Sequence, residues 1–361
     1  GGDLHGQGTV QNAFRTYVSA DSTVNADALT NGNGGKVVVW ADDVTRYYGS
    51  ISARGGAQSG DGGFVEVSGE RLLDFHGKAD LSAPNGANGT LLLDPANIEI
   101  STNAAANQTG FAPPGDQTEA FGDDAAANTV LNVAAGTGSF AGVAAGTTIE
   151  LQATNDINVI NDFNIATSTG VANVSLVLRA GNNINVGTTA NATITASGTG
   201  TLTLSADDNT ANGAGNVNIG GAATVGGLVT ANQAISITAA NVVIDPTQAG
   251  TTVNAGAGDV TLKPSTAVAV DVGTAAAGAF IVDNAEIGKI TSTGTITIGD
   301  GALASTMVVQ GVSAGAKNIS LATAGTINDN AANTAVTLTT GTLTLDAAST
   351  IGNTTTFNVD V

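Results

Sequence analysis

The sequence contains no cysteine among its 361 residues, so no disulfide can hold the fold together. Secreted proteins commonly use disulfides, which form in oxidising compartments. Large exported bacterial proteins nevertheless often avoid cysteine, because a premature disulfide would block passage through an outer-membrane pore. The absence of cysteine is therefore compatible with export as an unfolded chain.

Charged and aromatic residues are also scarce. Charged residues make up 11% of the chain, against about 25% in ordinary soluble proteins, and aromatic residues make up 4%. Ten basic residues face thirty acidic ones, which gives a net charge of −20. A nucleic-acid-binding protein needs a basic surface to displace counterions from phosphates, and anionic membrane surfaces also select basic proteins. We therefore expect neither nucleic acid nor an anionic membrane surface as a partner.

Long apolar runs are missing as well. No stretch of 18 or more apolar residues occurs, so the sequence predicts no transmembrane helix and no membrane insertion. The chain begins with Gly1 and shows no signal-peptide pattern. We expect it to be a processed or excised segment whose export signal lies upstream.

Short alternating segments, in which Val, Ile or Leu alternates with Thr, Asn or Ser, fill the remaining sequence. This period of two predicts half-buried β-strands, and Gly, Asn and Asp between them supply the turns. Representative segments are Ile157-Asn158-Val159, Ile184-Asn185-Val186, Ile235-Ser236-Ile237, Ile296-Thr297-Ile298 and Leu343-Thr344-Leu345.

The segments recur with a period of roughly 17–26 residues, which is typical of a solenoid. No helical pattern intervenes, so crossover helices between parallel strands are not expected. We predict an all-β, right-handed parallel β-helix, with some 17 coils that rise about 4.8 Å each into a rod on the order of 80 Å long. An antiparallel β-sandwich is the alternative. Stacked Asn and Thr side chains are expected to form ladders between coils.

The sequence predicts three regions. Residues 1–100 have conventional variety, and residues 1–80 hold the only Trp, all three Tyr, both His and six of the ten basic residues. Residues 148–361 are repetitive coils. Between them, residues 101–147 look like an irregular excursion, in which residues 111–116 break the strand pattern and a short helix is expected near residues 119–128. Such a segment can either cover the core or project as a binding loop.

The first hundred residues carry a resemblance. The segments that carry it are Gly32-Asn33-Gly34-Gly35-Lys36-Val37-Val38-Val39-Trp40-Ala41-Asp42, Ile51-Ser52-Ala53-Arg54-Gly55-Gly56-Ala57 and Gly89-Thr90-Leu91-Leu92-Leu93-Asp94-Pro95. They resemble the passenger region of filamentous-haemagglutinin-like exoproteins of Gram-negative bacteria. The resemblance implies two-partner secretion through a dedicated outer-membrane transporter, folding into an extracellular β-helix, and a role in adhesion to a receptor or glycan.

Few residues suggest chemistry. Asp74 and His76 share one face of a strand, which we interpret as a surface pair, and His5 has no evident partner in the sequence. Asp123, Asp124, Asp207 and Asp208 are weak candidates for Ca²⁺, which prefers several oxygen ligands, although solvated loops are the favoured interpretation of such pairs. We predict no catalytic residue, no enzyme activity and no cofactor, apart from this Ca²⁺. Pectate-lyase-like enzymes, which combine a β-helix with Ca²⁺ and a basic residue, are the enzymatic alternative.

The last residues, 356–361, form an alternating segment without a polar cap. An uncapped coil exposes backbone groups that can pair with another strand. Either the protein continues, or copies stack head to tail. The sequence thus predicts a secreted, non-catalytic structural or adhesive rod at the cell surface. A self-assembling filament or sheath is the first alternative and a polysaccharide lyase or hydrolase the second.

Overall fold

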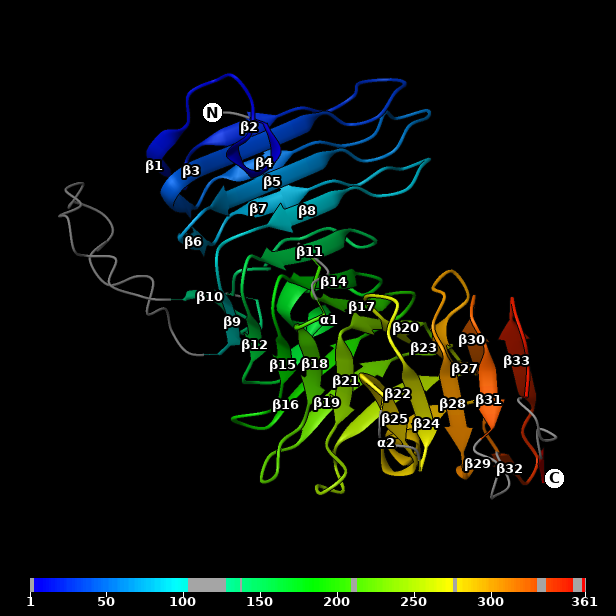
Figure 1. Cartoon of the computed structure of the whole chain (residues 1–361). Helices are drawn as coiled ribbons and strands as arrows, with labels where there is room; N and C mark the ends of the chain where they lie inside the picture. The colour runs from blue at the N-terminus through cyan, green and yellow to red at the C-terminus, as the bar shows by residue number, and fades with distance from the viewer. Residues whose placement is uncertain are drawn as a thin grey trace. The chain divides into compact units, whose positions relative to one another are not determined.

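The computed structural model describes residues 3–102, 128–136, 138–208, 213–274, 278–329, 336–352 and 359–360. The chain divides into two compact units (Figure 1). Unit 1 comprises Gly1–Arg179 with Ile194–Gly200, and unit 2 comprises Ala180–Thr193 with Thr201–Val361. In both units the strands form several all-parallel sheets. The fold is a parallel β-helix, as predicted, and the antiparallel sandwich is excluded.

Unit 1 is built around one long sheet in the order β1-β3-β5-β8-β11-β14, with β6 also pairing with β3. Shorter sheets, β2-β4-β7 and β10-β9-β12, form other faces of the coils, and β13 pairs with β16. The elements are η1 Leu4–Gly6, β1 Ala13–Val18, β2 Thr23–Asn25, β3 Lys36–Tyr47, β4 Ser50–Ser52, β5 Phe64–Gly69, β6 Leu72–Phe75, β7 Lys78–Asp80, β8 Thr90–Leu93, β9 Ile98–Ser101, β10 Thr129–Asn132, β11 Thr148–Ala153, β12 Ile157–Val159, β13 Phe163–Asn164, α1 Ile165–Thr169, β14 Ser175–Ala180 and β16 Ala192–Ala196.

Unit 2 repeats this plan with the long sheet β17-β20-β23-β27-β30-β33 and four shorter parallel sheets, β15-β18-β21, β19-β22-β26, β25-β24-β28-β31 and β29-β32-β34. Its elements are β15 Ile184–Val186, β17 Leu202–Ala206, β18 Asn216–Ile219, β19 Gly226–Thr230, β20 Ile235–Ala239, β21 Asn241–Ile244, β22 Thr252–Gly256, β23 Val260–Pro264, β24 Val270–Gly273, β25 Phe280–Asp283, α2 Asn284–Lys289, β26 Ile290–Ser292, β27 Thr295–Asp300, β28 Met307–Gln310, β29 Val312–Gly315, β30 Asn318–Thr323, β31 Ile327–Asp329, β32 Val336–Leu338, β33 Leu343–Ala347 and β34 Val359–Asp360.

The core of unit 2 follows directly from the alternation in the sequence. Ile235 and Ile237 of β20 are fully buried, whereas Ser236 between them is only half-buried on the outer face. Ile235 stacks in register on Val260 of the next coil. Because a one-residue slip would turn every apolar side chain outward, the alternation fixes the register of each coil.

Several coils are longer than the predicted range of 17–26 residues. Val260 pairs with Ile296, which lies 36 residues further along the chain, whereas Ile296 pairs with Ile319 after only 23 residues. The long coil carries the helix α2, whose N-terminus is closed by a capping box between Asp283 and Glu286. Inserted elements at the corners therefore lengthen the coils, and the sequence period overestimates their number.

Asparagine and aspartate side chains connect neighbouring coils. In unit 2 the Asn218 amide donates to the Oδ1 of Asn185 at 2.8 Å, and these two residues are in register on stacked strands. This pair is one rung of the predicted asparagine ladder. More often, the side-chain oxygen accepts a hydrogen bond from a backbone N–H on the next coil. Such bonds join Asn33 to Asp61, Asn173 to Thr199, Asn191 to Val225, Asn232 to Ala257, Asp259 to Thr295 and Asn284 to Ser313.

The predicted excursion, residues 101–147, is only partly described. Residues 103–127 and 137 lie outside the described residues, and with them the segment 111–116 and nearly all of the expected helix at 119–128. In the described remainder, β10 pairs in register with β9. Phe140 is buried and stacks on Phe163, with ring centroids 5.4 Å apart. This part of the segment therefore covers the core.

Among the described residues, no helix combines the length and the apolar character that crossing a membrane requires.

Candidate functional site

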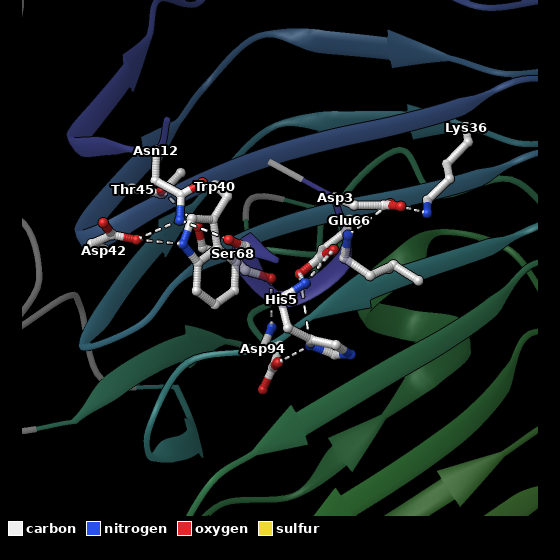
Figure 2. A network of polar contacts seen from close by, with 12 residues as sticks. Asp3, His5, Asn12, Lys36, Trp40, Asp42, Thr45, Glu66, Ser68 and Asp94 are labelled. Atoms are coloured by element: carbon white, nitrogen blue, oxygen red, sulfur yellow. Dashed lines mark hydrogen bonds and ion pairs between the residues drawn. The ribbon is translucent and has the colours of Figure 1, made fainter. Parts of the chain in front are cut away.

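A cluster of one histidine and two carboxylates lies on the outer face of the long sheet in unit 1 (Figure 2). Val65 and Val67 of β5 point into the core, so the alternation places Glu66 between them on the outside. Glu66 is nevertheless 0% exposed. Figure 2 shows the reason, since the N-terminal turn η1 crosses this face and lays His5 beside Glu66.

The three side chains are close enough to contact one metal ion. The Nδ1 of His5 lies 2.6 Å from an Asp94 carboxylate oxygen and 3.9 Å from a Glu66 oxygen. The His5 backbone N–H points at the Glu66 carboxylate, with its oxygens at 3.1 and 3.2 Å. One ligand atom from each residue can be chosen so that all three lie within 4.8 Å of one another.

Electrostatics at the cluster are dominated by burial. Burial raises the pKa of Glu66 above its ordinary value, against the lowering effect of the contacts with His5. Burial likewise raises the pKa of Asp94, which is only 8% exposed, and again the contact with His5 opposes the shift. Two carboxylates thus share one imidazole in a setting where unneutralised charge is costly.

The backbone of the N-terminal turn is constrained around the cluster. His5 adopts a left-handed conformation with φ +56°, which costs a non-glycine residue on the order of 1 kcal/mol. Gly6 follows with φ +67°, and a Cβ there would lie 2.2 Å from the Nε1 of Trp40. Asp3 forms an ion pair with Lys36 at the start of β3. These contacts fix the position of the His5 imidazole.

His5, for which the sequence offered no evident partner, thus has two. Its partners lie 61 and 89 residues away and become neighbours only when the coils stack. The sequence carried no signal for this contact, because an acidic residue between two core valines is the ordinary pattern of a strand whose outer face meets solvent.

The second predicted pair does form. The Nδ1 of His76 lies 2.9 Å from the Oδ1 of Asp74. Asp74 is 0% exposed, however, so the interpretation as a surface pair is wrong. Its second oxygen accepts a hydrogen bond from the Tyr48 hydroxyl at 2.5 Å, and burial together with this carboxylate raises the pKa of Tyr48. The buried Arg46 lies in register with Asp74 on the neighbouring strand. The pair belongs to a buried network.

The structure places only two of the four calcium candidates. Asp123 and Asp124 lie outside the described residues. The buried Asp207 carboxylate accepts hydrogen bonds from the Gly213 N–H at 2.9 Å and the Ser265 hydroxyl at 2.6 Å, which closes a corner between coils. Asp208 is exposed and accepts a hydrogen bond from the Ser205 hydroxyl at 2.7 Å. In the described part of the chain, these two do not belong to a group of three metal-ligating side chains.

Comparison with known proteins adds no family. No family model matches the chain, and no curated protein matches it either. The fold defines the class, a parallel β-helix protein with a net charge of −20 and, among the described residues, one cluster of three metal-ligating side chains.

Proposed function

We propose that this chain is part of an exported, non-catalytic β-helical rod at the surface of a Gram-negative bacterium, of the filamentous-haemagglutinin type, and that it serves in adhesion. The observation that carries the proposal is the in-register parallel stacking of successive coils in each unit, in which every coil is a template for the next. A chain with this design can fold coil by coil as it emerges from a pore, with no energy source outside the cell.

Composition supports the same proposal. The chain has no cysteine and little charge, which suits threading through an outer-membrane transporter in the unfolded state. Its net charge of −20 keeps neighbouring rods apart and soluble. The motifs between Gly32 and Pro95 that resemble the haemagglutinin-like family form the stacked strands β3, β4 and β8 and their corners.

Deleting the segment from the native exoprotein tests the proposal. We expect cells that export the shortened protein to lose attachment to host cells or to glycan-coated surfaces, with the amount of exported protein unchanged on immunoblots. Removing the outer-membrane transporter should instead abolish export. Unchanged attachment of the deletion strain would contradict the adhesive role.

A second candidate is a subunit of a head-to-tail filament, in which the first coil of unit 1 would stack on another copy instead of on a preceding part of the same protein. The end strand β1 leaves one backbone edge unpaired by any described strand. Most of the large, exposed apolar side chains in the described residues gather here, on Val10, Phe14, Tyr17 and Leu29, the last 87% exposed. A further β-helical coil stacked on this end would cover them. Exposed apolar patches of this kind mark interaction surfaces.

Negative-stain microscopy of the native material separates the two candidates. Single rods at all concentrations would exclude the filament, and unbranched fibres that lengthen with concentration would support it. Tyr17→Lys places a charge on the apolar end and should shorten such fibres. The lyase or hydrolase alternative receives no support from Asp207 and Asp208, whose described contacts belong to corners.

A further inference from the structure

We propose that His5, Glu66 and Asp94 bind a divalent transition-metal ion, best matched by Zn²⁺, which fastens the N-terminal turn η1 to the outer face of β5 and β8. The inference does not depend on the proposed adhesive role. It rests on the donor set, the spacing of the ligand atoms, the buried charge and the support around the three side chains.

The donor set matches zinc and disfavours calcium. Zn²⁺ accepts imidazole nitrogen and carboxylate oxygen ligands at about 2.0–2.2 Å. Ca²⁺ takes about six to eight oxygen ligands and does not select an imidazole. The cluster offers one nitrogen and two carboxylates, which is a three-ligand set that leaves a fourth position for water.

The distances from the His5 imidazole to the two carboxylates need only small adjustments to fit a zinc ion. Two atoms bound to one tetrahedral ion at about 2.1 Å lie about 3.4 Å apart. The separations from the Nδ1 of His5, 2.6 Å to Asp94 and 3.9 Å to Glu66, fall on either side of this value. A shift of the imidazole by less than about 1 Å away from Asp94 and towards Glu66 would make both distances suitable. The His5 side chain is 36% exposed, so an ion can reach it from solvent.

Charge at the site calls for a cation. Glu66 is completely buried and Asp94 nearly so, yet a single imidazole stands between the two carboxylates. A protonated imidazole neutralises only one of two ionised carboxylates, whereas a divalent ion neutralises both. Buried charges that lack full compensation are costly, and metal coordination is one of the ways proteins compensate them.

The surroundings hold the ligands in place. Glu66 is fixed by the His5 N–H, and the backbone of Asp94 donates to the hydroxyl of Ser68 at 3.2 Å. The left-handed backbone at His5 and the close packing of Gly6 on Trp40 orient the imidazole. Hydrogen bonds that hold the ligands in this way are typical of metal sites, where their loss weakens binding by about 10–100-fold.

Metal-free protein titrated with ZnCl₂ by calorimetry tests the site, with metal content measured after gel filtration. We expect one tightly bound Zn²⁺ per chain. His5→Ala and Glu66→Gln should each weaken binding by at least about tenfold, because each removes a direct ligand. His76→Ala, which removes the only other histidine, should leave the affinity unchanged. Circular dichroism establishes that each variant is folded, and CaCl₂ should not compete with Zn²⁺.

A second measurement needs no change in the cluster itself. The His76→Ala protein retains a single imidazole, so its ¹H–¹⁵N NMR spectrum reports His5 alone. We expect Zn²⁺ to shift these imidazole resonances at one equivalent. An imidazole that Zn²⁺ leaves unshifted, or Zn²⁺ binding that His5→Ala and Glu66→Gln do not weaken, would overturn the proposal.

Discussion

The two units use the same backbone plan with different outer faces. Unit 1 covers part of its outer face with a turn, and places charged side chains beneath it or between its coils, among them Glu66, Asp43 and Asp74. In the long sheet of unit 2 the outer face is mainly Thr, Ser and Asn, half-exposed over a core of Ile, Leu and Val, as in β20 and β23. The parallel coil thus tolerates two surface chemistries. Among the described residues, only the first gathers a histidine and two carboxylates from distant coils into one cluster.

The largest expected effect concerns the core of unit 2. Ile237→Ala should lower the free energy of unfolding by about 2–5 kcal/mol, because it leaves a cavity between stacked coils. Ser236→Ala, its neighbour on the outer face, should change it by less than about 0.5 kcal/mol. Urea unfolding followed by circular dichroism checks both variants, and equal costs would contradict the assignment of inner and outer faces.

Glu286 is an exception in unit 2, and it predicts a pH dependence. Burial raises its pKa to about 7, although it accepts hydrogen bonds from the backbone of Asp283 and Ile244. The unfolded chain therefore loses this proton at lower pH than the folded one. Unfolding free energy should fall as pH rises from about 5 to 8, by up to about 3 kcal/mol from this group.

Urea unfolding at several pH values in this range gives the slope of the unfolding free energy against pH. Glu286→Gln cannot ionise and should flatten it, although the amide loses one of the two acceptor oxygens and lowers stability at all pH values. A variant with the same slope as the wild type would show that another group is responsible.

Asp43 tests the contribution of buried charged contacts to the stability of unit 1. Its carboxylate accepts hydrogen bonds from Arg15 at 2.8 Å and from Arg71 at 2.6 Å. Burial alone would raise the pKa of Asp43, but the two arginines outweigh it and hold the pKa below the ordinary value. Asp43→Asn should cost about 2 kcal/mol at neutral pH, since both arginines lose an ionic partner.

The wild type should be more stable than Asp43→Asn above about pH 4. This difference should disappear as pH falls further, because protonation of Asp43 then removes the charge that the substitution removes. Asp42→Asn is the matched control, because Asp42 is exposed and its hydrogen bonds from Trp40 and Asn12 survive in an amide. Equal effects of the two substitutions, measured by thermal unfolding, would refute the importance of the arginine bridge.

The smallest effect concerns the asparagine ladder. Asn218→Ala removes one inter-coil hydrogen bond and should cost about 1 kcal/mol. Thr203→Ala, at a half-buried outer-face position of β17, is the comparison. If the asparagine variant cost no more than the threonine variant, the ladder would have no measurable role in holding unit 2 together.

Local chemistry made much of the fold predictable from the sequence. The alternation in Ile235-Ser236-Ile237 defines its buried face, Asn at corners explains the contacts between coils, and the two-residue spacing of Asp74 and His76 puts their side chains together. The cluster around His5 depends on stacking register instead. Thr90 follows Phe64 after 26 residues, a regular coil that brings Asp94 near Glu66. His5 lies in η1, before the first strand, so no repeat in the sequence places it over them.

Parallel stacking in register is the central claim, and paired engineered cysteines test it most directly because the chain has no native cysteine. Ser236 and Thr261 are partners on adjacent coils, whereas Ser236 and Thr297 are separated by one more coil. Stacked partners lie about 4.8 Å apart, within disulfide range, and the second pair about twice as far. Rapid oxidation of the Ser236→Cys, Thr261→Cys protein, with none for Ser236→Cys, Thr297→Cys, is the predicted result. Equal oxidation of both pairs, or of neither, would contradict the stacked parallel coil.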